Sequence, residues 1–340
     1  MSIPPRLVRR TLFPPLILAT TFITLTTLPL WLLVALVVTP FVRGRWRPLR
    51  LLAMVLVYLI YESIGIIQLT MLWLRSGFGR TLHTESMQEE HYDLMRWFLS
   101  GMYRAGVRLF KLRVEVDSSQ SIVDPNHLDP RPLLVFARHA GPGDSFLIAY
   151  GVLVLLHRRT RVVLKDTLQL DPCIDIVMNR LPNRFITPNP QAGRDLVAAI
   201  GQLAEGMDER DALIIFPEGG NFTERRRVHA IERLRKRGHH DEAERATRMR
   251  NVLAPRPGGA LASVAATPIS DIMFVAHTGL EELSSVLDLY RGIPMDGSLK
   301  VRWWIVREEE LPDGEEARID WLFDHWSAID TWIEEHKEPA

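Results

Sequence analysis

The sequence predicts an α/β protein with a mostly parallel central sheet flanked by helices, preceded by a two-segment membrane anchor at the N-terminus. After residue 130, short apolar runs bounded by turn formers alternate with longer runs of helical periodicity, a pattern typical of parallel sheets. Before residue 80, two long stretches are almost free of charge. The composition, 47% apolar and 24% charged, also allows a sizeable core.

Charge and cysteine content narrow the class of protein. The formal net charge is zero, so nothing in the overall charge favours binding to nucleic acid, and we predict no nucleic-acid partner. The single cysteine, Cys173, cannot form an internal disulfide and offers no metal-binding cysteine cluster. The sequence therefore suits a reducing compartment.

The two apolar stretches, about 11–42 and 51–74, predict a membrane anchor within residues 1–80, and Glu62 is the one charged residue in them. Each is long enough to cross a bilayer, which takes about 20 apolar residues. Arginines precede the first stretch as in a secretory signal, but the stretch far exceeds the roughly 7–15 residues of a signal core. We therefore expect a cell-membrane protein whose second domain, 81–340, faces the cytoplasm.

Two topologies of the anchor stay open. Arginines crowd the loop between the stretches and also lie at both outer ends, so the positive-inside rule favours neither orientation. Prolines in the first stretch would bend or end helices, as in a hairpin that enters one leaflet and returns: Pro14, Pro15, Pro29 and Pro40. Two spans and a re-entrant hairpin both fit these observations.

The elements that follow are assigned in order. Mixed charged and aromatic residues over 85–111 indicate a helix, residues 113–116 a strand, and the proline-rich residues 124–130 a loop. The apolar run 133–137 is short enough for a buried strand, Gly141–Gly143 predicts a turn, and the longer run 145–157 predicts a helix.

The second half continues the alternation. We predict strand 161–165, a loop with Pro172, Pro182 and Pro188, helix 191–207 and strand 212–216. Residues 224–250 form a charged helical insertion with a basic bias. Further strands are expected at 269–276 and 299–306, and an amphipathic helix ends the chain.

The strand ending at 137 carries the first candidate for chemistry. His139 would lie at the carboxyl edge of the sheet, and Asp144, five residues later, is near enough to hydrogen-bond one ring nitrogen. The other nitrogen could then accept a proton. Strand 212–216 ends similarly, because Pro217, Glu218 and Gly219 follow it and Glu218 would reach the same edge.

Together these stretches resemble the lysophosphatidic acid (1-acylglycerol-3-phosphate) acyltransferases. The family's histidine-four-residues-aspartate signature matches His139 to Asp144, and its Phe-Pro-Glu-Gly block matches 216–219. The strand ending at Lys165 and the proline-rich block 255–259 are similar too, and residues 222–224 with 252–256 look most like the lysocardiolipin branch. The resemblance covers about 133–270.

The chain departs from the family pattern at three places. Arg138 stands where asparagine is usual, Pro188 stands where the second block has an arginine, and Gly220-Asn221 replace Thr-Arg in the third block. Two arginines that the family uses to hold an acceptor phosphate are therefore absent from their usual positions.

The resemblance implies transfer of a fatty acyl group from an acyl thioester to a hydroxyl of lysophosphatidic acid or a related lysolipid. His139 would act as general base and Asp144 would orient it. Glu218, Gly219, Lys165 and Arg138 are the expected substrate-binding residues. Acyl-coenzyme A or acyl-carrier protein would be a co-substrate, membrane lipids the other partners, and no cofactor or metal is expected.

Two rival classes of function are weighed against this one. A metal hydrolase would need further strong ligands such as His127 and His277, but no metal-ligand spacing appears in the sequence. A membrane-tethered lipid-binding module without catalysis would explain the absent arginines. The sequence does not indicate an oligomeric state.

Overall fold

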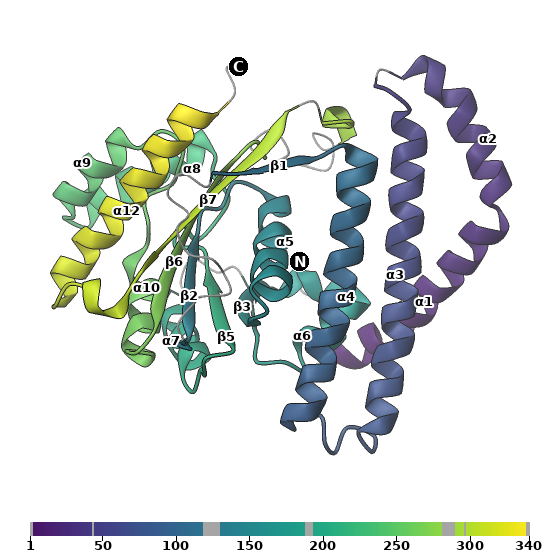
Figure 1. Cartoon of the computed structure of the whole chain (residues 1–340), viewed down its shortest axis with the longest axis horizontal. Helices are drawn as coiled ribbons and strands as arrows, with labels where there is room; N and C mark the ends of the chain where they lie inside the picture. Colours follow the sequence, from purple (N-terminus) through teal and green to yellow (C-terminus); the bar gives the residue numbers. More distant parts are fainter. Residues whose placement is uncertain are drawn as a thin grey trace. The chain divides into compact units, whose positions relative to one another are not determined.

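A computed structural model describes residues 3–42, 44–117, 130–187, 193–280, 290–295 and 297–337 (Figure 1). The chain forms two compact units that interleave along the sequence. Unit 1 comprises Met1–Leu112, Val162–Asn189 and Tyr290–Asp296, and unit 2 comprises Arg113–Arg161, Pro190–Leu289 and Gly297–Ala340.

Unit 1 begins with helices α1 (Arg6–Thr26), α2 (Leu28–Val38), α3 (Arg47–Arg75) and α4 (Glu85–Phe110), with a short 3-10 turn, η1 (Thr39–Phe41), after α2. Helices α3 and α4 lie side by side (Figure 1). Their close approach requires Gly101, because a Cβ there would overlap the Tyr61 ring. Pro14 and Pro15 lie inside α1, so they do not end it.

One helix of the described chain, α3, is long and apolar enough to cross a membrane. The pair α1 and α2–η1 also passes this test if it is counted as one span, but it bends by 69° at Thr27, just before Pro29 in the first turn of α2. Many large apolar side chains of α2 are exposed, namely Leu30, Trp31, Leu32, Leu33, Val34, Leu36, Val37 and Val38.

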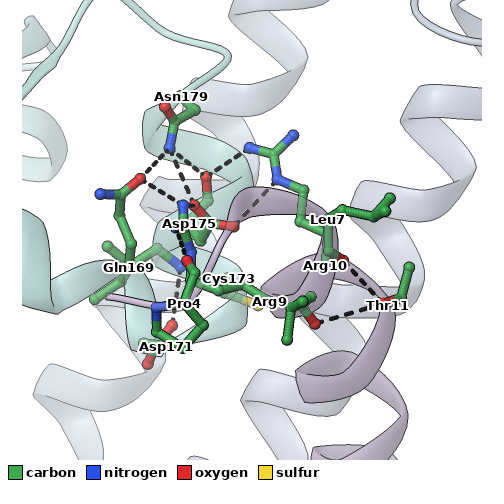
Figure 2. Close-up of polar contacts among 12 residues, drawn as sticks. Pro4, Leu7, Arg9, Arg10, Thr11, Gln169, Asp171, Cys173, Asp175 and Asn179 are labelled. Atoms are coloured by element: carbon green, nitrogen blue, oxygen red, sulfur yellow. Dashed lines mark hydrogen bonds and ion pairs between the residues drawn. The ribbon is translucent and has the colours of Figure 1, made fainter. Parts of the chain in front are cut away.

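The N-terminal end of α1 is held by a buried carboxylate on α6 (Pro172–Met178) (Figure 2). Asp175 Oδ1 accepts a hydrogen bond from Arg9 at 2.8 Å, and Oδ2 accepts one from Arg10 at 3.1 Å. Gln169 accepts from Arg9, and Asn179 donates to Asp175. The loop predicted around Pro172 is wrong here, because Asp171 caps a helix that begins with that proline.

Unit 1 also contains a short parallel pair of strands. The end of β3 (Arg159–Lys165), which begins in unit 2, pairs with β4 (Arg184–Ile186), with Val163 opposite Arg184. A 3-10 turn, η4 (Asp166–Leu170), connects β3 to α6.

Unit 2 is built on the rest of the sheet. Its other strands are β1 (Arg113–Val116), β2 (Leu133–Ala137), β5 (Asp211–Ile215), β6 (Asp271–Thr278) and β7 (Ser298–Val306). The order across the sheet is β1-β7-β6-β2-β5-β3-β4, and of the strand pairs with a described register only β6 and β7 are antiparallel. The predicted mostly parallel α/β fold is confirmed.

The helices of unit 2 are α5 (Pro142–Tyr150), continued by a π-helical turn, η3 (Gly151–Leu155), then α7 (Gly193–Ala204), α8 (Glu224–Lys236), α9 (His240–Arg248), α10 (Pro257–Ala266) and α12 (Glu315–His336). A 3-10 turn, η6 (Glu308–Glu310), precedes α12, which packs on β6 and α10 (Figure 1).

Most of the predicted elements of unit 2 appear within a few residues of their expected ends. The predicted turn at Gly141–Gly143 is only partly correct, since Pro142 already begins α5. Most of the predicted loop 124–130 lies outside the described residues.

Candidate active site

The site lies where two neighbouring parallel strands end. Strands β2 and β5 run in register, with Phe136 opposite Ile215, and every residue of both strands is buried. His139 follows β2 and Glu218 follows β5, so the polar residues after each strand meet at the carboxyl edge of the sheet. The two stretches lie together at this edge, as expected, and the N–H of His139 donates to Glu218 Oε1 at 2.8 Å.

Asp144 is fixed by the start of α5. It is the third residue of the helix, and its Oδ2 accepts hydrogen bonds from the N–H groups of Ala140 and Gly141 at 2.6 and 2.9 Å. Its Oδ1 accepts from the Ser145 hydroxyl at 3.1 Å. The carboxylate of Asp144 thus points back toward the residues that precede the helix. This position, at the N-terminus of a helix, is favourable for a negative charge.

Asp144 is held in its ionised form. Burial alone would raise its pKa, but the hydrogen bond and charge of His139, the nearby His277 and the Gly141 N–H outweigh burial and lower the pKa below its usual value. The carboxylate is 1% exposed, so this negative charge acts in a poorly solvated place. Asp144 is therefore an acceptor for a neighbouring N–H over the whole range of neutral pH.

The imidazole of His139 faces that carboxylate. Its Nδ1 lies 3.1 Å from each oxygen of Asp144, so Nδ1 carries the proton and Nε2 carries the lone pair in the neutral ring. Within the described part of the chain, Nε2 has no hydrogen-bond partner. The ring packs on Phe216 at 4.5 Å, and the side chain is 13% exposed. Nε2 is thus an oriented proton acceptor beside an apolar ring.

Glu218 holds the main chain rather than an open site. Its Oε1 accepts from His139 and its Oε2 accepts the N–H of Leu253 at 2.8 Å, while the side chain is 1% exposed. Burial raises the pKa of Glu218 to about 8, although Arg138 and these two N–H groups oppose the shift. The N–H of Phe222 also donates to the His139 carbonyl at 2.8 Å, so His139 is held on both sides.

The side chain of Arg138 points into the protein interior. A residue that contacts a substrate directly would be expected to reach the surface of the site. Its guanidinium is fully buried and donates to the carbonyls of His277 at 2.8 Å and Asn251 at 2.9 Å. His277 Nε2 in turn lies 3.2 Å from the Arg138 carbonyl and 3.7 Å from Asp144 Oδ2. Arg138 therefore joins the ends of β2 and β6 to the loop at Asn251.

That loop is fixed from a second direction by the last helix. Asp330 on α12 accepts the N–H groups of Arg250 at 2.8 Å and Asn251 at 2.6 Å. The loop that contacts Arg138 and Glu218 is thus held at its start by α12 and further along by the turn after β5.

The other predicted substrate-binding residues lie in different surroundings. Gly219 has a positive φ of 68° and lies directly under the guanidinium of Arg256. Lys165 ends β3 in unit 1 and is exposed. Its predicted role stays a prediction, as do the substrate contacts proposed for Arg138 and Glu218, whose buried side chains contact main-chain groups of the protein.

Sequence reasoning missed the supporting residues Asn251, Leu253 and Asp330, because main-chain contacts leave no residue pattern. His277 was considered only as a metal ligand, whereas it ends a strand beside β2 and contacts Asp144. The second proposed ligand, His127, lies outside the described residues.

Fold and site together define a class of protein: an α/β protein with a histidine, oriented by a buried carboxylate, at the carboxyl edge of a mostly parallel sheet. Comparison with known proteins specifies the class. Residues 114–272 match the family model described as Acyltransferase, and the chain is an acyltransferase that carries this domain.

A solved structure has the same fold. The 1-acyl-sn-glycerophosphate (LPA) acyltransferase PlsC from Thermotoga maritima aligns with a TM-score of 0.51 and 18% identity, over 85% of this chain and 97% of that one. The chain thus has the fold of a lysophosphatidic acid acyltransferase. No curated protein matches the chain. The closer resemblance to the lysocardiolipin branch stays a prediction.

Proposed function

We propose that this protein is a membrane-bound O-acyltransferase of phospholipid biosynthesis. It moves a fatty acyl group from an acyl thioester to a hydroxyl of lysophosphatidic acid or a related lysolipid. The observation that carries the proposal is the geometry of His139, whose Nδ1 contacts both oxygens of Asp144 while Nε2 is left to accept a proton. The acyltransferase domain and the PlsC-like fold support the type of reaction.

The chemistry follows from this pair. Nε2 of His139 takes the proton of the acceptor hydroxyl as its oxygen attacks the thioester carbonyl, and Asp144 stabilises the imidazolium that forms. The tetrahedral intermediate then breaks its carbon–sulfur bond. The departing thiolate receives the proton from Nε2, so His139 returns to its starting form and no acyl-enzyme is needed.

Glu218 and Arg138 serve as positioning residues in this mechanism. Glu218 fixes the main chain of His139 through its N–H, and Arg138 fixes the strand ends beside it. Neither group needs to touch a substrate for this role. General acid–base catalysis by a positioned side chain contributes about 10²–10⁴-fold, and that contribution depends on such fixed geometry.

The donor is acyl-coenzyme A or acyl-carrier protein, and no other cofactor is used. The exposed apolar faces of α1, α2 and α3 support attachment to the cell membrane, with the catalytic unit on its cytoplasmic side. The 69° bend at Thr27 favours a re-entrant path for α1 and α2 over one straight span.

The test is acyl transfer from acyl-coenzyme A to lysophosphatidic acid by detergent-solubilised wild type and His139→Ala. We expect a loss of about 10²–10⁴-fold in kcat, because the proton acceptor is removed. His229→Ala is the matched control, since His229 is an exposed histidine of α8 without a side-chain partner among the residues described.

Equal activity in wild type and His139→Ala would contradict the mechanism and favour a lipid-binding module. Membranes of the same cells, taken before detergent is added, test the membrane part of the proposal. Activity should stay in the membrane pellet after an alkaline carbonate wash, and recovery in the supernatant would contradict it.

A further inference from the structure

Four arginines gather beside the turn that holds His139. Arg226, Arg233 and Arg237 lie on or at the end of α8, and Arg256 is the residue immediately before α10. We call these four residues the arginine cluster. All four belong to unit 2.

Arg256 is placed by main-chain bonds to the turn after β5. Its N–H donates to the carbonyl of Pro217 at 2.8 Å, and Leu253 just before it donates to Glu218. The guanidinium therefore lies across Gly219, where a Cβ would be 2.9 Å from its Cζ. A side chain at this position would displace the guanidinium, and the positive φ of Gly219 favours glycine as well.

Arg226 reaches the same turn from α8. Its Nη1 donates to the Asn221 carbonyl at 3.0 Å and would lie 3.5 Å from a Cβ on Gly220. The stretch from Glu218 to Phe222 thus contacts His139 at both ends and carries two guanidinium groups between them. A negative group bound there would lie on the segment that positions the general base.

The positive charge of the cluster is not neutralised within the described part of the protein. Across the described ranges, no carboxylate forms an ion pair with any of its four guanidinium groups. Burial lowers the pKa of Arg256, and the charges of Arg233, Arg237 and Arg226 lower it further. Arg226, Arg237 and Arg256 are nonetheless exposed, so water screens this repulsion and an anion from solution can reach the group.

The first turn of α10 adds to the positive potential. Helix N-termini carry partial positive charge, and α10 begins directly after Arg256. Arginine is also the side chain best suited to phosphate, since its planar donors can bind two oxygens at once. The occupant is therefore an anion with several oxygens and more than one negative charge.

We propose that the arginine cluster binds a phosphate monoester carried by a substrate, with Arg256 as the main contact. This rests on the proposed function. The cluster supplies the cationic groups that Gly220 and Asn221 do not provide in the third block. Lysophosphatidic acid and coenzyme A both carry a phosphate monoester, so the site would serve either the acceptor or the donor.

The experiment measures equilibrium binding to the full chain in detergent micelles, in a His139→Ala background with one ligand present at a time, so that no acyl transfer takes place. Two ligand pairs differ by one phosphate monoester: lysophosphatidic acid with monoacylglycerol of the same chain, and coenzyme A with dephospho-coenzyme A. In one of the two pairs, Arg256→Gln should lower the affinity for the phosphorylated ligand at least tenfold, as expected for a lost charged hydrogen bond. The affinity for the ligand without the phosphate should change by less than twofold.

Arg256→Lys should restore part of the affinity, and Arg233→Gln with Arg237→Gln should weaken it in the same pair. Arg225→Gln is the matched control, because Arg225 is an exposed arginine of the same helix that does not act on Arg256. Its binding should equal that of the parent.

The pair that responds identifies the substrate concerned. Unchanged binding in both pairs, or equal weakening of both members, would overturn the proposal. Weaker attachment to anionic vesicles as the sole effect would also overturn it, since the cluster would then be a membrane contact. Because binding needs no turnover, these results stand apart from the activity of His139→Ala, which tests the proposed function.

Discussion

Two buried aspartates in different units are surrounded in contrasting ways. Asp175 in unit 1 binds two arginines, whereas Asp144 in unit 2 binds main-chain N–H groups, a hydroxyl and the ring of His139, with His277 nearby. Both are 1% exposed. The first carboxylate is neutralised by groups that are always charged. The second faces a group whose charge can change, which is what a proton-transfer site requires.

The comparison teaches that burial of a carboxylate does not by itself identify a catalytic residue. At Asp175 the arginines come from α1 and the carboxylate from α6, so the contact attaches the N-terminal helix (Figure 2). At Asp144 the partners come from the carboxylate's own turn, so the contact orients one ring. Substitutions of Asp175 should therefore change the stability of the protein, and substitutions of Asp144 should change the rate of the reaction.

The largest effect is expected from Asp144→Asn. The amide cannot accept from all the donors that meet the carboxylate, and it does not stabilise the imidazolium, so kcat should fall by about 10³–10⁴-fold. Steady-state kinetics on the solubilised protein would measure this. Asp175→Asn serves as the matched control and should keep kcat per folded molecule within about threefold. A similar loss of kcat in both variants would remove the distinction.

The next effect concerns stability. Asp175→Ala leaves the guanidinium of Arg9, 6% exposed, without its carboxylate, and breaking a buried pair costs about 3–5 kcal/mol of unfolding free energy. Denaturant unfolding in detergent would measure it. Arg9→Leu combined with Asp175→Leu should recover much of the loss, because no uncompensated charge then remains. Equal stability of Asp175→Ala and wild type would show that the cluster does not attach α1.

The smallest effect is a pH dependence of stability. It distinguishes Asp144 from a third buried carboxyl, Glu218. The pKa of Glu218 is raised from 4.5 to about 8, so the folded chain favours the protonated acid. Its contribution to stability is present below its unfolded pKa and is lost as pH rises through about 8. The pKa of Asp144 is shifted in the opposite direction, because it is lowered by folding. Its contribution to stability is therefore present at neutral pH and is lost only as pH falls through the lowered pKa.

Melting temperatures between about pH 5 and pH 9 would test these signs. Wild type should lose stability toward the alkaline end, and Glu218→Gln should show a shallower slope even if it is less stable throughout. Asp144→Asn should keep most of the wild-type slope in this range, since the charge of Asp144 is the smallest of the causes that act on the pKa of Glu218. An unchanged slope in Glu218→Gln would show that Glu218 is ionised across the range.

The sequence was informative about the site wherever position along a strand decides geometry. His139 and Glu218 follow two apolar runs, and parallel neighbours bring their ends to one edge, so their proximity was predictable. Asp144 was predictable from its spacing to His139. The direction of a side chain beyond a strand is not predictable in this way: Arg138, expected to contact a substrate, is buried and donates to main-chain carbonyls.

The sequence was least informative where distant segments meet. Asp175 follows a proline in a stretch that looks like a loop, and its partners Arg9 and Arg10 lie some 165 residues earlier. Nothing in the local pattern shows such a pair. The arginine cluster is similar, because the basic bias of α8 is visible in the sequence but the position of Arg256 over Gly219 depends on main-chain contacts.

The hydrogen bonds that the loop at Asn251 donates to Asp330 give α12 a part in the order of assembly. A chain is made from its N-terminus, so β2, β5 and the arginine-bearing α8 leave the ribosome well before α12. Until α12 emerges, the loop that contacts Glu218 and Arg138 lacks its second support. The candidate active site is therefore completed late in synthesis, long after helices α1 to α4 have been made.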